Sequence, residues 1–251
     1  MAAAAADTGR WNQVIDKIVL VDTPAQEGRL LESLAELPAA RTLGFVNAHA
    51  MNLCAVDPQF AATLAAADLL LRDGIGMALL YRKLRLAPGL NMNGTDLIPK
   101  IIAQFRGRRA AFWGTTEPFL GKAADRCRSD FEVEVISTAD GFQSPDHYIA
   151  IAHQQRPDLI VLGMGMPKQE RLAMQLRSAV SHAPLIVCGG AILDFLGGKV
   201  PRAPEWIRSI GMEWLYRLAG EPRRLFQRYV LGNPIFLMRL IAWRGPRPTG
   251  A

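Results

Sequence analysis

Short apolar runs of β-forming residues alternate with helical patterns along most of this 251-residue chain. Helical patterns of roughly eight to a dozen residues follow several of these runs. Such alternation is typical of a mostly parallel sheet with helices on both faces. We therefore predict a Rossmann-like α/β fold, with strands over residues 17–21, 42–47, 68–71, 109–113, 132–137, 159–162 and 185–188 and helices over residues 58–67, 77–84, 95–105, 118–129, 146–155 and 168–178.

The alternation ends near Gly198, and the rest of the chain is basic. Ten Lys or Arg and three Glu lie beyond residue 198, which is +7 against +6 for the whole chain, so the first 198 residues carry −1. Trp and Arg recur there at helical spacings, which predicts a helix over residues 204–219, another from Pro222 and a third apolar segment after Pro234. We predict a flexible N-terminus over residues 1–12, an α/β domain over residues 13–198 and a basic amphipathic helical appendage over residues 199–251. Such an appendage suits an anionic membrane surface or a phosphate-bearing ligand.

The sequence also bears on cellular compartment. No stretch reaches the ~18 uninterrupted apolar residues that a spanning helix needs, and the opening MAAAAADTGR lacks the apolar core of a signal peptide. The three Cys have no metal-ligand spacing and are expected to be buried, reduced thiols. We expect a cytoplasmic protein whose appendage lies on a membrane without crossing it.

Glycine-rich or small polar residues follow five of the predicted strands. In parallel sheets ligands bind at these strand ends, where glycine lets backbone approach a ligand and helix N-termini offer N–H groups to phosphate. Each loop alone is consistent with a plain turn, and none is a GxGxxG or Walker motif. Together they favour a nucleotide-like ligand, with candidate contacts at Asn47, His49, Asp73, Gly114, Gly163, Gly165, Gly189 and Gly190.

Several polar residues in these loops could carry chemistry. Asp73 could act as a general base, bind a sugar hydroxyl or cap the next helix, and His49 could be a base, a phosphate donor or a polar core residue. Thr95 and Asp96 could cap a helix or contact phosphate or sugar, and Lys168 and Gln169 are placed for a diphosphate or sugar hydroxyls. No DxD triplet or His/Asp/Glu cluster predicts a metal site, and no cofactor is expected. Arg, Lys and backbone N–H groups would then neutralise a diphosphate.

Long segments of this chain resemble the WecG/TagA/CpsF family of glycosyltransferases. They are LRDGIGMALLYRKL, NMNGTDLIPKII, VLGMGMPKQE and CGGAILDFLGGKVPRAPEWIRSIGMEWLYRLAGEPRRLFQRYVLGNPIFL, and the similarity extends from about Ile15 to Trp243. The resemblance implies an inverting, metal-independent enzyme that moves a hexose or N-acetylhexosamine-type sugar from a UDP-sugar to a polyprenyl-diphosphate-linked acceptor, such as an undecaprenyl diphosphate. The resemblance also implies a role in the synthesis of cell-surface polysaccharide, including exopolysaccharide, at the inner face of the bacterial plasma membrane.

The resemblance also implies roles for individual residues. Asp73 matches the proposed general base, and Gln169 matches a site residue. Asn47-Ala48-His49 stands where the family has Thr-x-Asn; this departure leaves the substrate open and lets His49 share the base role. Four arginines match an appendage that closes over the site, namely Arg202, Arg217, Arg224 and Arg228, and we expect Phe236, Leu240 and Trp243 to meet lipid.

Three alternatives remain at this level. A nucleotide-cofactor (NAD-type) oxidoreductase could share the fold, but its glycine and acidic signatures are missing. A nucleic-acid-binding protein could use the Trp and Arg of the basic tail, although no nucleic-acid motif accompanies it and we expect no nucleic-acid partner. The tail could also be a helical pair packed permanently on the core. The sequence decides neither the sugar nor the oligomeric state, a homo-oligomer being one alternative.

Overall fold

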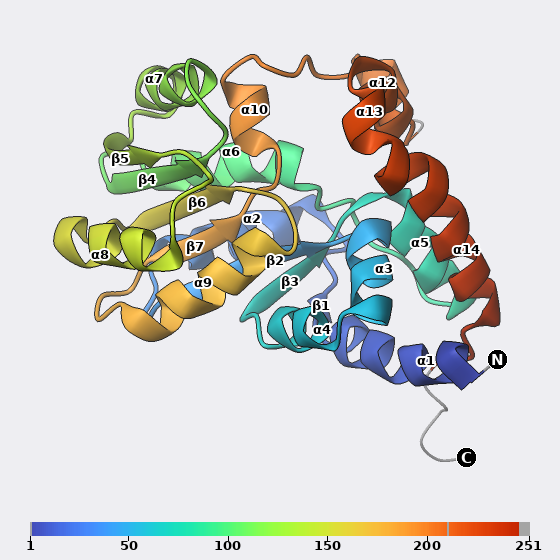
Figure 1. Ribbon diagram of the computed structural model, residues 1–251. Coiled ribbons are helices and arrows are strands. Elements are labelled where there is room, and N and C mark those ends of the chain that lie inside the picture. The colour runs from blue at the N-terminus through green and yellow to red at the C-terminus, as the bar shows by residue number, and fades with distance from the viewer. Residues whose placement is uncertain (1, 210, 246–251) are drawn as a thin grey trace.

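The computed structural model describes residues 2–209 and 211–245 and contains a seven-stranded sheet (Figure 1). Every pair of neighbouring strands is parallel, in the order β1-β3-β2-β7-β6-β4-β5. The Rossmann-like α/β prediction is thereby confirmed. The strands are β1 (Ile18–Val19), β2 (Arg41–Val46), β3 (Leu69–Arg72), β4 (Arg109–Gly114), β5 (Glu134–Ala139), β6 (Leu159–Gly163) and β7 (Leu185–Cys188).

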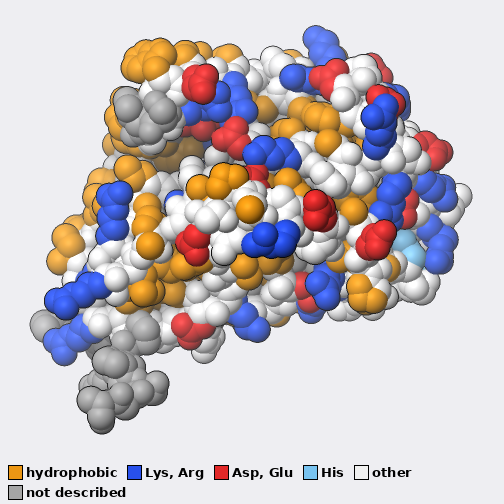
Figure 2. Space-filling view, turned by 180° about the vertical axis from the view of Figure 1, so that it is seen from behind, with side chains coloured by type: hydrophobic (Ala, Val, Ile, Leu, Met, Phe, Trp, Pro, Cys, Tyr) orange, Lys and Arg blue, Asp and Glu red, His pale blue; other side chains and the backbone are white. Residues whose placement is uncertain are grey.

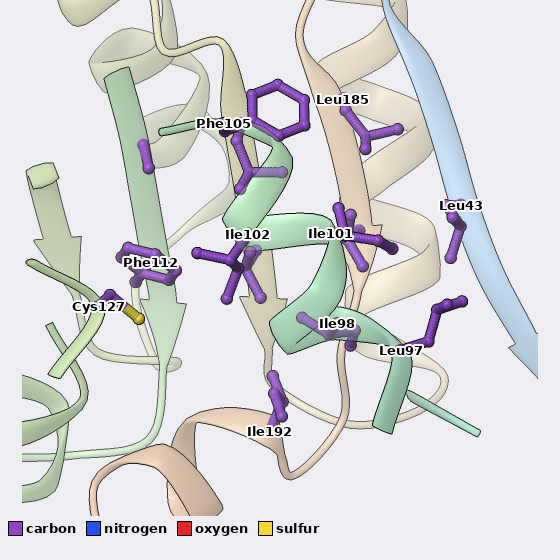
Figure 3. Close-up of a cluster of buried hydrophobic side chains, with 14 of the residues drawn as sticks. Leu43, Leu97, Ile98, Ile101, Ile102, Phe105, Phe112, Cys127, Leu185 and Ile192 are labelled. Atoms are coloured by element: carbon purple, nitrogen blue, oxygen red, sulfur yellow. The ribbon is translucent and has the colours of Figure 1, made fainter. Parts of the chain in front are cut away.

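Helices cover both faces of the sheet, because central parallel strands must bury side chains on each side. One face packs against α2 (Pro24–Ala35), α6 (Gly94–Gln104), α7 (Phe119–Phe131) and α10 (Ile192–Leu196). Figure 3 shows α6 at the centre of this layer, with Ile98, Ile101 and Ile102 directed at the strands. The other face packs against α1 (Ala2–Ile15), α3 (Ala48–Val56), α4 (Pro58–Ala65), α5 (Gly74–Lys83), α8 (Pro145–Gln155) and α9 (Lys168–Ala179).

Polar residues begin several of these helices and set their first turns. Thr23 forms a capping box with Gln26 at the start of α2, and Asp57 accepts a hydrogen bond from the third residue of α4. Asn93 caps α6, since its Oδ1 accepts from Asp96 N at 2.9 Å. The residue that caps α6 is therefore Asn93, and the predicted capping role of Thr95 or Asp96 is wrong.

The N-terminal segment differs from the flexible residues 1–12 expected from sequence. It forms α1, whose C-terminal half is buried against the rest of the molecule. Trp11 is 2% exposed and its Nε1 donates to Met51 O at 2.9 Å. The physical reason is that Trp11, Val14 and Ile15 present one apolar face, which the alanine-rich opening obscured.

The C-terminal appendage consists of short helices followed by a longer one. The predicted helix over residues 204–219 is split into α11 and α12, with Gly211 between them at φ 74°. The segment predicted after Pro234 begins earlier, at Gly232, because proline is tolerated in a first helical turn. The elements are α11 (Glu205–Ser209), α12 (Glu213–Gly220), α13 (Pro222–Leu225), the π-helix η1 (Phe226–Leu231) and α14 (Gly232–Ala242).

The prediction that Phe236, Leu240 and Trp243 meet lipid is wrong. All three are buried in one cluster with α1, α3 and α5, and the Trp11 ring lies 5.6 Å from that of Phe236 and 5.8 Å from that of Trp243. The opposite side of α14 is the exposed one. In the part of the chain that the structure describes, no helix combines the length and apolar character needed to cross a membrane.

Candidate active site

Asp73 lies directly after β3, beside the end of β2. Its backbone N–H donates to Val46 O at 2.8 Å, and its Oδ2 accepts from Asn47 Nδ2 at 3.2 Å. The oxygen of the Asn47 amide is already engaged, because it caps α3 by accepting from Ala50 N at 3.0 Å. Asn47 therefore presents its NH₂ group to the carboxylate. Asp73 stands at the N-cap position of α5 but makes no capping hydrogen bond, so the capping interpretation is not supported.

The surroundings of Asp73 favour a basic carboxylate. Burial raises its pKa, whereas the Asn47 hydrogen bond and the charges of Arg228, Arg217 and Arg72 oppose the rise. His49, in the first turn of α3, has its pKa lowered to about 4 by burial and by the charge of Arg228. Near neutral pH, His49 is thus an uncharged imidazole close to Arg228.

Two residues that sequence reasoning missed hold the Asp73 loop in place. Arg72 is buried, and its guanidinium donates to Pro88 O and, at 2.7 Å, to Gly89 O. Asn91 Oδ1 accepts from Gly74 N at 2.8 Å. The loop after β3 is therefore fixed to the segment before α6. An Arg directly after an apolar strand was the available signal for Arg72, because a buried guanidinium needs several acceptors.

Three appendage side chains near Asp73 keep buried polar atoms without hydrogen-bond partners: Arg217 Nε, Arg228 Nε and Glu213 Oε1. Arg217 packs over the Phe195 ring at 5.2 Å, and Arg228 packs over the Tyr229 ring at 5.4 Å. Burial raises the pKa of Glu213, which also responds to the charges of Arg202, Arg217, Asp96 and Asp73. Buried polar atoms are nearly always paired, so this group is suited to a polar, anionic ligand.

The other two predicted arginines form ion pairs, whereas Arg217 Nη1 donates to Tyr229 Oη at 3.4 Å. Arg224 pairs with Glu221, and Arg202 pairs with Asp96, which also accepts from Arg208 Nη1 at 3.3 Å. These Asp96 pairs join the start of the appendage to α6. Thr95 lies half-buried in the first turn of α6.

Packing within the protein accounts for three of the predicted glycines. Gly114 and Gly163 face each other at the ends of β4 and β6, where a Cβ on Gly114 would lie 2.4 Å from Gly163 O. A Cβ on Gly163 would lie 2.8 Å from Leu193 Cγ, and one on Gly189 would lie 2.5 Å from Ile192 Cγ2. These close approaches are between parts of the chain, so a ligand is not needed to explain them.

Gln169 and Lys168 begin α9 but have different environments. Gln169 is buried, and its Oε1 accepts from Gly165 N at 3.0 Å and from Gly190 N at 2.9 Å. Lys168 Nζ donates to Gly141 O at 2.7 Å. The backbone amides of Gly165 and Gly190, two of the predicted ligand contacts, are thus engaged by Gln169. Among the described residues, no three His, Cys, Asp or Glu side chains are grouped so as to hold a metal ion.

The site therefore joins a partly buried carboxylate and its amide partner on the body to an arginine pair from the appendage. Residues 17–249 match the sequence model described as "Glycosyl transferase WecG/TagA/CpsF family". Since this match spans nearly all of the chain, the protein belongs to the WecG/TagA/CpsF family of glycosyltransferases.

Proposed function

We propose that this glycosyltransferase moves a hexose or N-acetylhexosamine-type sugar from a UDP-sugar to a polyprenyl-diphosphate-linked acceptor, with inversion at the anomeric carbon. The observation that carries the proposal is that Arg217 and Arg228 lie near enough to Asp73 for their charges to lower the pKa of its carboxyl, and that both keep a buried Nε without a partner among the described residues. A general base and a cationic group for a departing diphosphate are the two elements that such a displacement needs.

Asp73 is the better candidate for the base. Its pKa is raised, whereas the pKa of His49 is lowered to about 4, and a general base works best when its pKa lies nearer the working pH. Asp73 would take the proton from the acceptor hydroxyl as that oxygen attacks C1 of the sugar. The bond between C1 and the UDP oxygen breaks as the new bond forms, and UDP departs. Asn47 and neutral His49 would hold substrate hydroxyls.

The appendage arginines would neutralise the departing diphosphate. The Nε atoms of Arg217 and Arg228 are buried and unpartnered, so an anionic oxygen would complete their hydrogen bonding. Arg224 and Arg202 would join them after releasing Glu221 and Asp96. In this proposal the arginines supply the charge that a divalent metal supplies in other enzymes, so transfer would be metal-independent.

We further propose that the exposed side of the appendage docks on the anionic inner face of the bacterial plasma membrane, where the lipid-linked acceptor lies. Figure 2 shows hydrophobic side chains gathered along the edge formed by α14 and above it. Met238 is 62% exposed and Ile241 is 80% exposed, and Arg223 and Arg244 are exposed nearby in the sequence. Apolar and cationic side chains together favour an anionic interface. The exposed set is Phe226, Val230, Leu231, Ile235, Leu237, Met238 and Ile241.

A panel assay tests the proposed reaction. Purified full-length protein is given radiolabelled UDP-sugars and a short lipid-diphosphate acceptor, with and without EDTA, and the product anomer is read by NMR. We expect transfer from one or a few UDP-sugars, unaffected by EDTA, with inversion. Retention of configuration, or loss of transfer in EDTA, would contradict the mechanism. Transfer only from donors other than UDP-sugars would contradict the donor class.

A further inference from the structure

The side-chain amide of Gln169 joins the loop that follows β6 to the loop that follows β7. Gln169 Oε1 accepts hydrogen bonds from Gly165 N and Gly190 N, which follow β6 and β7. Both glycines have positive φ, 77° and 59°, a conformation that other residues rarely adopt. Gln169 is 1% exposed, so water does not compete for these bonds. The relative position of the two loops therefore depends on which end of the Gln169 amide faces them.

Glu170 holds the other end of the same amide, in the orientation that the two glycine N–H groups require. Gln169 Nε2 donates to Glu170 Oε1 at 2.8 Å, and Glu170 is 4% exposed. An ionised carboxylate only accepts hydrogen bonds, so the NH₂ group must face it and the carbonyl oxygen must face the glycines. A protonated carboxyl is a weaker acceptor than a carboxylate, so protonation of Glu170 weakens its hydrogen bond from Gln169 Nε2 and loosens the amide that the two glycine N–H groups share. Glu170 Oε2 is buried without a partner.

The charge of Glu170 is also linked to the appendage. Burial raises the pKa of Glu170 to about 7, and the charge of Arg228 in η1 opposes this rise. Two thiols respond to the charge of Glu170, which raises the pKa of Cys188 on β7 and of Cys54 on α3. Arg171, the next residue, pairs with Asp57 at 2.6 Å. Arg228 is thus the cation that favours the ionised form.

We propose that Glu170 is a positioning residue, which as a carboxylate holds the Gln169 amide in place between the two glycine loops. Because linkage is reciprocal, Arg228 favours the ionised carboxyl, and the ionised carboxyl favours the Arg228 position seen here. The role in sugar transfer rests on the proposed function. The pH titration of the Gly165 and Gly190 amide signals does not depend on the proposed function.

NMR of protein labelled with ¹⁵N-glycine tests the proposal without any substrate. In the wild type, we expect the Gly165 and Gly190 amide signals to shift together with a midpoint near pH 7. Glu170→Gln keeps an oxygen that can accept from Gln169 and should abolish the shift. Arg228→Gln should raise the midpoint, because it removes the charge that favours ionisation. Cys188→Ser, the thiol control, should leave the titration unchanged.

Two results would overturn the positioning role: glycine amides that do not titrate, or amides that titrate equally in Glu170→Gln. If that variant does not fold, Gln169→Met replaces it, and titration that persists without the side-chain amide would be equally contradictory. In turnover, protonation of Glu170 should add to the acid-side fall in kcat/KM that protonation of the base Asp73 also causes, so Glu170→Gln should shift this limb and lower the rate about tenfold. Titrating amides with an unshifted limb in Glu170→Gln would refute the link to turnover, and no transfer at all would refute the proposed function alone.

Discussion

The two halves of the appendage are attached to the body in different ways. In α14, buried Phe236, Leu240 and Trp243 join one cluster with α1, α3 and α5. In α12 and η1, by contrast, Arg217 and Arg228 reach the region of Asp73, and the buried Nε atom of each has no hydrogen-bond partner among the residues that the structure describes. One half is packed like a core, and the other is incomplete like a binding site. The comparison suggests that α14 serves as an anchor that places the arginines.

The largest effect is expected when the incomplete half loses its charge. Arg228→Gln, or Arg217→Gln, should lower kcat/KM by about 10²–10³-fold, since each removes a donor to charge that develops in the transition state. Thermal melting should change little. The matched control is Arg223→Gln, because Arg223 is exposed on the neighbouring α13. Equal losses in the control and in either site variant, measured with a soluble acceptor, would end the distinction between the two halves.

Substitutions in α14, the anchored half, should lower the free energy of unfolding. Phe236→Ala removes a side chain that is 1% exposed and stacked on Trp11, and a truncation of this kind costs about 3–5 kcal/mol. Denaturant unfolding measures the change in free energy. Phe226→Ala, a truncation at a 48% exposed position in η1, should cost less than about 1 kcal/mol. Similar costs for the two variants would show that α14 is not an anchor.

A smaller effect is expected at the end of α14. Lys83 Nζ donates to the carbonyl oxygens of Leu240, of Ile241 at 2.9 Å and of Trp243 at 2.6 Å. Lys83→Met keeps the aliphatic stem but leaves these acceptors unpaired, which should cost about 1–3 kcal/mol. Arg82→Met, at the exposed neighbouring position, serves as the control. An unchanged unfolding free energy in Lys83→Met would remove this contact from the anchor.

The smallest effect concerns the outer side of α14. Ile241→Ser changes an 80% exposed side chain, so stability should stay within about 0.5 kcal/mol. Binding to anionic liposomes should weaken by about threefold to tenfold, because the lost apolar contact contributes to interfacial binding. Val56→Ser, at a 64% exposed position on α3, should leave binding unchanged. Co-sedimentation with anionic vesicles measures the binding of each variant. Equal binding by Ile241→Ser and Val56→Ser would contradict docking through α14.

Sequence patterns predicted the sheet well because strand and helix periods are local properties. They placed Asp73 at a strand end for the same reason. The face of α14 was predicted wrongly because apolar residues surround this helix, as Phe236 and Leu240 on one side and Leu237 and Ile241 on the other. Only the position of α1 and α3 decides which side is buried, and this is a tertiary property.

The remaining site details also depend on contacts between distant segments. Gln169 could be predicted as a site residue, but its engagement of Gly190 requires the arrangement of β6 and β7. Arg72 and Asn91 escaped notice because their partners lie 16 or 17 residues away along the chain. Local motifs therefore predicted the loops of the candidate site, and the tertiary structure showed which of their polar groups already have hydrogen-bond partners.

Turnover by Asp73→Asn tests the central claim most directly. The substitution keeps the size of the side chain but removes its ability to take a proton, so single-turnover transfer at saturating substrates should fall by about two to four orders of magnitude. Melting temperature and UDP-sugar affinity, measured by calorimetry on the same preparation, should be close to those of the wild type. Near-normal transfer by folded Asp73→Asn protein would contradict the assignment of Asp73 as the general base.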